Sequence, residues 1–283
     1  MIIKKARVED FEQIYNLLLD FNNSSIKKED WRQLFINHWN NSEDYFGYVL
    51  IDNNKAVGFQ GLIFSRRIIN GQTQKICNLT SWIVKREYRN NSVALLLPVL
   101  KLKGYTITNF TASKEVCLML KRLGFKELET RIKIIPPVSV IGFLSGKCSV
   151  EFDRNEIKRH LSKKDLNIYS DHSKLKAIYL LIKEGDEYSY LVLNRTKKRF
   201  FHFAQIHYIS NLRIFLKYIN RISMRICLRL NVFGLLVDER YVEGHKIRNL
   251  ITIKLSQPNL FKAEFLTRDD INTLYSELLV LNI

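Results

Sequence analysis

Apolar and polar residues recur with two different periods along the chain, and these periods predict its helices and strands. A helix follows a short opening strand, because Phe11, Ile14 and Leu18 recur at three- and four-residue spacing. A second, aromatic-rich helix is expected at residues 31–39, and strands are expected at residues 46–51, 56–69 and 76–84. Turn residues such as Asn70-Gly71 separate these strands, which indicates an antiparallel meander.

The pattern then alternates between helix and strand up to a pair of prolines. We expect helices at residues 93–102 and 113–123, and extended segments at residues 105–111 and 126–134. Gly124 supplies the left-handed residue that ends a helix. Pro136 and Pro137 cannot continue a sheet ladder, so we place a domain boundary there and expect domains at residues 1–135 and 136–283.

The second half repeats this order of elements loosely. Loop and helix signals occupy residues 142–161, extended segments are expected at 177–183, 188–194, 200–209, 226–237 and 247–255, a helix at 212–221, and an amphipathic segment at 268–279. The predicted class is therefore α/β (α+β) with two domains. The second domain is either an independent α/β domain or a degenerate copy of the first.

Charge and composition narrow the choice of partners. The chain has 45 Lys and Arg against 28 Asp and Glu, a formal charge of +17, which attracts phosphates and other anions. The excess is shared between both halves and forms no basic tail, so solvated faces are the simpler interpretation. Nucleic-acid binding is disfavoured but stays open as an alternative.

The cysteines, histidines and apolar runs argue against a metal site and a membrane span. The four cysteines lie far apart without CxxC pairing, and His202 and His207 are expected on opposite faces of a strand. The longest apolar run, residues 93–100, is much shorter than the roughly 20 residues that a spanning helix needs. The start of the chain lacks secretory features, so we expect a cytoplasmic protein without a transmembrane segment.

The segment from Cys77 to Ala94 carries the chemistry. A strand runs to Val84, a short basic loop follows, and a helix is expected to begin near Val93. A strand that ends in a loop and a helix start directs several free backbone N–H groups and the positive end of the helix dipole at one point. This geometry is typical of a phosphate-binding site.

These residues resemble the GNAT family of acyl-CoA-dependent N-acyltransferases, whose pyrophosphate loop reads Arg/Gln-x-x-Gly-x-Gly/Ala after a strand ending in Val. Arg89, Ser92 and Ala94 stand at its three defining positions. The resemblance covers residues 1–135 and includes the Leu-Gly-Phe that ends at residue 125. It implies a mixed, mostly antiparallel sheet flanked by helices, with acetyl-CoA (coenzyme A) as the cofactor.

The resemblance also implies roles for individual residues. Those expected at the cofactor are Trp82, Ile83, Val84, Arg89, Asn90, Asn91, Ser92, Val93, Ala94, Ser113 and Cys117. Asn78 stands where some family members carry a carboxylate base; an amide cannot take a proton but can orient a water. The chain departs from the family at Ser92, which replaces a loop glycine, and at Leu120, which replaces a tyrosine acid.

Each of these residues also has a simpler interpretation. His38 and Thr80 are expected on the acceptor side, although His38 fits a surface histidine and Asn78 fits a buried amide bonded to backbone. Cys117 fits a small core residue. Residues 93–102 fit an ordinary core helix.

The predicted function is N-acylation of a small-molecule amine. The expected acceptor is an amino sugar or sugar nucleotide of surface polysaccharide synthesis. The basic charge of the chain suits an acceptor that is phosphorylated or linked to a nucleotide. The alternatives are acylation of an amino acid or peptide, and a non-catalytic GNAT-derived binding module. We expect residues 136–283 to serve acceptor recognition, because no comparable loop follows the strand that ends at Ile209.

Overall fold

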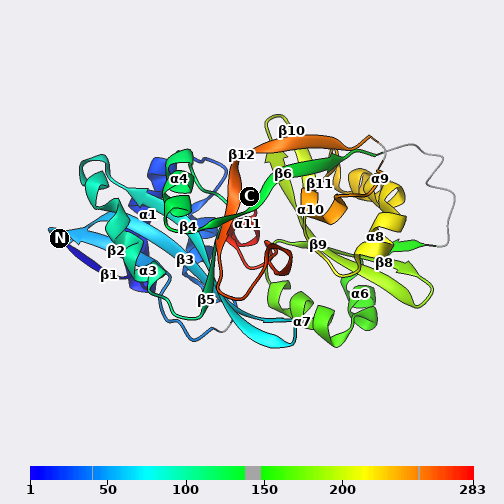
Figure 1. Ribbon diagram of the computed structural model, residues 1–283, viewed down its shortest axis with the longest axis horizontal. Coiled ribbons are helices and arrows are strands. Elements are labelled where there is room, and N and C mark those ends of the chain that lie inside the picture. The colour runs from blue at the N-terminus through cyan, green and yellow to red at the C-terminus, as the bar shows by residue number, and fades with distance from the viewer. Residues whose placement is uncertain (40, 138–147, 248) are drawn as a thin grey trace. The chain divides into compact units, whose positions relative to one another are not determined.

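A computed structural model describes residues 1–39, 41–137, 148–247 and 249–283 of the protein (Figure 1). The chain divides into two units. The first holds Met1–Leu128 together with Asn259–Ile271 and Tyr275–Leu281, and the second holds Glu129–Pro258 together with Asn272–Leu274 and Asn282–Ile283. Residues 136–283 therefore do not form a single unit as the sequence predicts, because two late segments of the chain return to the first unit.

The sheet of the first unit has the strand order β1-β2-β3-β4-β5-β12. Its strands are β1 (Ile2–Lys5), β2 (Gly47–Asp52), β3 (Lys55–Ile69), β4 (Gln72–Val84), β5 (Tyr105–Asn109) and the last part of β12 (Ile251–Lys262). Neighbouring strands are antiparallel except β4 and β5, which pair in parallel. The predicted meander is confirmed, and a late strand of the chain completes the sheet beside β5.

Helices of the first unit lie between and after these strands. They are η1 (Val8–Asp10), α1 (Phe11–Leu18), η2 (Leu19–Phe21), α2 (Lys28–Arg32), η3 (Gln33–Phe35), η4 (Arg86–Leu95), α3 (Leu97–Leu100), α4 (Lys114–Arg122), η5 (Arg268–Asp270) and α11 (Glu277–Val280). Leu95, Val99 and Leu120 from η4, α3 and α4 are buried in one hydrophobic cluster with sheet residues such as Leu62 and Leu79. This core holds β4 and β5 in place.

The second unit has its own sheet and helices. Its strands are the larger part of β6 (Lys126–Ile135), β7 (Ser149–Glu151), β8 (Ile178–Glu184), β9 (Glu187–Lys198), β10 (Phe201–Ile209) and β11 (Leu235–Asp238), and its helices are α6 (Arg154–His160), α7 (Lys163–His172), α8 (Leu212–Lys217), α9 (Ile219–Leu230) and α10 (Glu239–Val242). The strand order is β6-β11-β10-β9-β8-β7, and only β10 and β11 are parallel.

The two sheets share one topology. In each, an antiparallel run of four strands leads to a parallel strand, and a sixth strand lies beyond that one. The sixth strand of the second unit, β6, comes from the first half of the chain, and the sixth strand of the first unit, β12, comes from the second half. The shared order is what the degenerate-copy alternative predicts.

Several predicted elements differ from the structure. Residues 226–237 are not one extended segment, since α9 continues to Leu230 with Ile219, Ile222 and Ile226 buried on one face at helical spacing. Residues 93–102 are not one helix, because a 3-10 segment extends to Leu95 and the α-helix spans only Leu97–Leu100. The helix expected at residues 31–39 ends earlier, at η3.

The amphipathic segment expected at residues 268–279 contains only η5 and the beginning of α11. Part of the loop and helix expected at residues 142–161 falls outside the described residues, and α6 lies in the rest. The predicted stop of α4 is confirmed, since Gly124 has a φ of 87°, in the left-handed region.

Candidate functional site

The strands β4 and β5 separate at one point, and beyond this fork no strand of the described residues pairs with the β5 side of β4. Their parallel pairing ends at Leu79 and Asn109, where β5 itself ends, whereas β4 continues to Val84. On its other side β4 stays paired with β3. Beyond the Thr80 carbonyl, which accepts Gln60 Nε2 at 2.9 Å, residues 81–84 have no described strand on the β5 side, and this is a position at which an extended ligand can pair.

A bulge at the fork changes the direction of β4. Ser81 has a φ of 48°, and the register between β3 and β4 shifts between Phe59 and Gly61. Such a bulge bends the strand and increases its twist. Trp82, Ile83 and Val84, which follow the bulge, are half-buried.

The segment after β4 is fixed to the sheet at its start. The Lys85 N–H donates to the Val57 carbonyl at 2.9 Å, and the Tyr88 hydroxyl donates to Asp52 Oδ2 at 2.9 Å. Arg89 and Asn90 then lie exposed. These contacts support a loop that holds its exposed residues in a defined position.

The conformation of this segment differs from the predicted one. Residues 89–94 lie within the 3-10 helix η4, where N–H groups bond to carbonyls three residues back, so fewer N–H groups are free than at a loop before an α-helix. The helix that follows, α3, has only four residues, and Pro98 lies in its first turn. The expected dipole contribution from a long helix beginning at Val93 is therefore absent from the described structure.

A cluster of polar side chains lies just inside the fork. Asn78 Nδ2 donates to Thr108 Oγ1 at 3.2 Å, which joins β4 to β5 one step before the pairing ends. Asn78 Oδ1 accepts the N–H of Glu277 at 3.2 Å. The carboxylate of Glu277 in turn accepts the Thr111 hydroxyl at 2.8 Å, through Oε1. Asn78 is fully buried, Glu277 is 1% exposed, and Thr111 is exposed.

Glu277 is the unusual member of this cluster. Its other carboxylate oxygen, Oε2, is buried and has no hydrogen-bond partner among the described residues. Burial raises the pKa of Glu277 to about 7, although the hydrogen bond from Thr111, its own backbone and the Asn78 side chain act in the opposite direction. A carboxyl group with a pKa of about 7 is suited to accept or release a proton near neutral pH.

Comparison with known proteins gives structural matches but no sequence matches. No protein-family model and no curated protein matches the chain. A GCN5-related N-acetyltransferase from Anabaena variabilis matches 92% of this chain and 71% of its own, at a TM-score of 0.61 and 14% identity. One from Kribbella flavida matches 93% and 70%, at a TM-score of 0.60 and 10% identity. The chain has the GNAT fold.

A third match concerns one region of a larger protein. A fungal multi-domain β-N-acetylglucosaminidase with a GCN5-related glucosamine N-acetyltransferase region matches 92% of this chain and 38% of its own, at a TM-score of 0.59 and 13% identity. The predicted GNAT-like class, a mixed and mostly antiparallel sheet flanked by helices, is thereby confirmed.

Within the GNAT fold, the residues expected on the acceptor side do not gather in an open cleft. His38 lies outside the helix, and its Nε2 is 2.9 Å from the Gln33 carbonyl oxygen. Burial lowers the pKa of His38, while the bond to Gln33 acts in the opposite direction. The cavity that His38 and Trp39 line measures about 10 Å³, about the space for one water. Thr80 is buried at the fork.

Two of the residues assigned to the cofactor, Ser113 just before α4 and Cys117 within it, differ in exposure. Ser113 caps the helix, accepting the Val116 N–H at 3.3 Å through its exposed hydroxyl. Cys117 is 2% exposed and packs in the core, where burial raises the pKa of its thiol. Leu120 is fully buried in the same cluster. These positions favour the core interpretation of Cys117.

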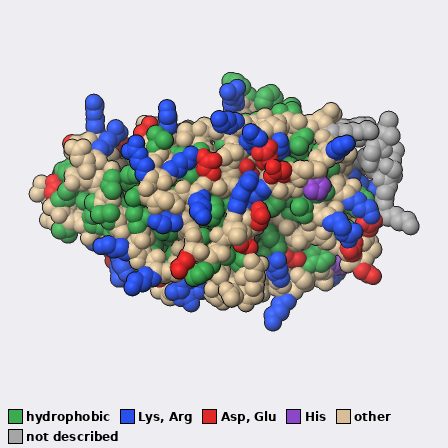
Figure 2. All heavy atoms as spheres, viewed as in Figure 1, with side chains coloured by type: hydrophobic (Ala, Val, Ile, Leu, Met, Phe, Trp, Pro, Cys, Tyr) green, Lys and Arg blue, Asp and Glu red, His purple; other side chains and the backbone are tan. Residues whose placement is uncertain are grey.

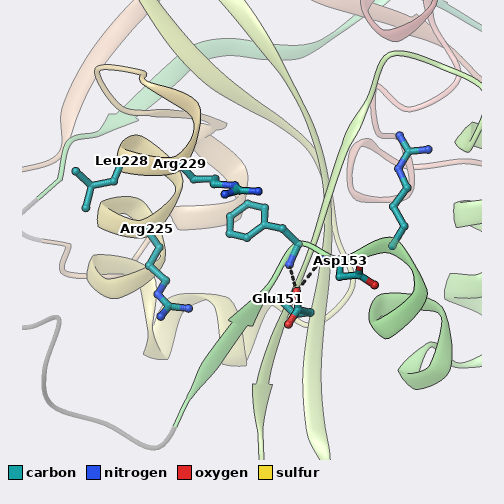
Figure 3. Close-up of a pocket in the computed structure, with 7 residues that line it drawn as sticks. Glu151, Asp153, Arg225, Leu228 and Arg229 are labelled. Carbon is teal, nitrogen blue, oxygen red and sulfur yellow. Dashed lines mark hydrogen bonds between the residues drawn. The ribbon is translucent and has the colours of Figure 1, made fainter.

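A cavity of about 850 Å³ lies in the second unit (Figure 3). It is lined by Glu151, Phe152, Asp153, Arg154, Arg225, Leu228 and Arg229. The carboxylate of Glu151 accepts the N–H groups of Phe152 and Asp153 at 2.7 Å, and the Arg229 guanidinium lies over the Phe152 ring. Because these charged groups are already engaged within the protein, the lining indicates no particular ligand.

Neither the surface charge in Figure 2 nor the described metal-ligating residues indicate a further binding site. On the face shown in Figure 2 the Lys and Arg side chains are scattered among neutral ones and form no continuous stripe. Among the residues placed in the structure, no group of three His, Cys, Asp or Glu could hold a metal. None of the described helices combines the length and apolar character needed to cross a bilayer.

The sequence analysis predicts a role for Asn78 but does not single out Glu277 or Thr111. A lone acidic residue at the head of the apolar run Leu278-Leu279-Val280-Leu281 is a weak indication of a buried carboxyl group. Nothing in the sequence indicates that this residue meets β4.

Proposed function

We propose that this protein is an acyl-CoA-dependent N-acyltransferase, with acetyl-CoA as the donor and a small-molecule amine as the acceptor. The observation that carries the proposal is the free edge of β4 at the fork, on a chain with the GNAT fold. An extended ligand with amide groups, such as the pantetheine arm of coenzyme A, would complete that edge with backbone hydrogen bonds.

The donor would bind along residues 82–94. Trp82, Ile83 and Val84 would flank the arm, and a backbone N–H near Ile83 or Val84 would stabilise the oxyanion. The exposed Arg89 would pair with phosphate, supported by the fixed start of η4. The other residues proposed at the donor are Asn90, Asn91, Ser92, Val93, Ala94 and Ser113, with Cys117 behind them in the core.

In the reaction the neutral amine attacks the thioester carbonyl carbon. The C–N bond forms, the C–S bond breaks, the nitrogen loses a proton and the thiolate of coenzyme A gains one. Holding the two reactants in contact supplies much of the rate enhancement.

The acceptor is proposed from chemistry alone. An amino sugar, free or linked to a phosphate or nucleotide, suits a chain of charge +17, and the fungal glucosamine N-acetyltransferase region shares this fold. Amino acids and peptides are the competing acceptors. We propose that the second unit serves acceptor recognition, since α8 begins three residues after β10 ends, without a segment like η4, which separates β4 from α3 in the first unit and to which the donor is assigned. Four free, buried cysteines fit a reducing, cytoplasmic setting.

The proposal is tested by ligand-dependent melting and by turnover. Coenzyme A and acetyl-CoA should each raise the melting temperature, and release of free thiol from acetyl-CoA should depend on one amine in a panel of glucosamine, glucosamine phosphate, amino acids and a peptide. Stabilisation without turnover of any amine would favour the non-catalytic binding module. Stabilisation only by an oligonucleotide, lost at higher salt, would favour the nucleic-acid alternative.

A further inference from the structure

The carboxyl group of Glu277 is brought to the fork by a segment far along the chain. Glu277 lies in α11, which belongs to the first unit although it comes near the end of the sequence. Its N–H bonds to Asn78 on β4, and its carboxylate bonds to Thr111 just beyond β5. The residue therefore touches both sides of the fork where the strands part.

The cluster leads from a buried carboxylate to the surface. Glu277 is 1% exposed, its Oε2 has no partner among the described residues, and its Oε1 accepts from a hydroxyl on the exposed Thr111. An unpaired buried carboxylate oxygen destabilises the fold. Such a group lowers the stability of the folded protein. Buried polar groups without a partner and with a shifted pKa are typical of functional sites.

We infer that Glu277 accepts the proton that the amine loses during acyl transfer, with the Thr111 hydroxyl as the relay. This inference rests on the proposed function and assigns to it the base that Asn78 cannot supply. As the C–N bond forms, the nitrogen gives its proton to Thr111 Oγ1, and Thr111 passes its own proton to Glu277 Oε1. Glu277 then returns a proton through Thr111 to solvent, while the departing thiolate is protonated, so charge and protons balance.

Burial is the largest cause of the raised pKa of Glu277. The elements beside it contribute Asn78 and Thr108 from the strands and Gln33, Leu34 and Phe35 from η3, none of which is charged. Two residues before Glu277, the ring of Tyr275 lies under the guanidinium of Arg67 from β3, 4.8 Å from the ring centroid. Burial thus holds the pKa of Glu277 at about 7, and the Thr111 hydrogen bond lowers it.

The test compares Glu277→Gln, which keeps the shape and the acceptor oxygen but cannot take the proton, with the exposed Glu127→Gln as the matched control. The rate of transfer from acetyl-CoA to the most active amine of the panel is measured from pH 5.5 to 9. In the wild type, kcat/KM should fall below about pH 7, and Glu277→Gln should lose this dependence and about 100-fold of kcat at pH 8. Acetyl-CoA affinity should stay unchanged.

Two variants of Thr111 separate a relay from a structural role. Thr111→Val removes the hydroxyl while keeping the size of the side chain, so kcat should fall and the acid limb should move to higher pH, because the lost hydrogen bond lowered the pKa of Glu277. Thr111→Ser keeps the hydroxyl and should restore both. If Thr111 had a purely structural role, the two variants would show similar pH–rate profiles, or Thr111→Val would have the higher kcat.

The outcomes distinguish this inference from the proposed function. If the wild type transfers to no amine, the proposed function fails and the inference fails with it. If the wild type transfers and Glu277→Gln keeps the rate and the pH profile, the inference alone is refuted. Loss of rate in Glu277→Gln with reduced acetyl-CoA affinity would also refute it, because the defect would then lie in binding.

Discussion

Replacing Glu277 by glutamine should stabilise the protein, and by an amount that grows with pH. The folded state raises the pKa of Glu277 from 4.5 to about 7, so ionising this group costs more in the folded than in the unfolded chain. Its contribution is fully present below pH 4.5 and is lost as the pH rises to 7. At about 1.4 kcal/mol for each unit of pKa, the loss approaches about 3.5 kcal/mol above pH 7.

Urea unfolding followed by tryptophan fluorescence measures this difference directly. All three tryptophans, Trp31, Trp39 and Trp82, lie in the unit that contains Glu277, so the signal reports that unit. The free energy of unfolding of Glu277→Gln, less that of the wild type, should rise from pH 5 to pH 8. The control Glu127→Gln, which breaks an exposed pair with Lys121, should stay within about 1 kcal/mol of the wild type.

A difference for Glu277→Gln that stays flat or becomes negative between pH 5 and pH 8 would refute this reasoning. It would mean that the carboxyl group ionises at its ordinary pKa, through contact with water or with a cation in the folded protein. The assignment of Glu277 as a proton acceptor near neutral pH would then lose its electrostatic support.

Three further predictions concern the donor. Coenzyme A at 100 times its dissociation constant should add about 2.7 kcal/mol to the free energy of unfolding, and no shift in the melting temperature at millimolar ligand would argue against a donor site. Arg89→Ala should weaken coenzyme A binding by about 1.5–3 kcal/mol in calorimetry because a charge-assisted contact is lost, whereas Arg86→Ala, the exposed neighbour, should bind as the wild type does. The same titration should give one coenzyme A for each chain, because in the first unit the 3-10 segment η4 lies between the end of β4 and the next α-helix, whereas in the second unit α8 begins three residues after β10 ends; a stoichiometry of two would contradict the assigned roles of the units.

Local patterns in the sequence predict much of the first sheet. The long extended segments that form β3 and β4 are separated by Asn70 and Gly71, both of which have positive φ in the structure, so the hairpin and its register follow from neighbouring residues. Gly124 ends α4 for the same local reason. The hydrophobic pattern gave a wrong prediction at the end of α9, because its dense apolar run fits a strand as well as a helix. In the structure the buried residues of α9 lie on one face at helical spacing.

Long-range packing decided the candidate site. The resemblance to the GNAT family predicts a role for Asn78, but its hydrogen-bond partner Glu277 is 199 residues away, and no period or motif links the two. The same holds for the exchange of β6 and β12 between the units. Periodicity records which face of an element is buried, whereas the choice of what covers that face depends on packing energies summed over the whole chain. The sequence by itself therefore determined the hairpin of β3 and β4 and the end of α4, and the tertiary structure decided which carboxyl group stands at the fork.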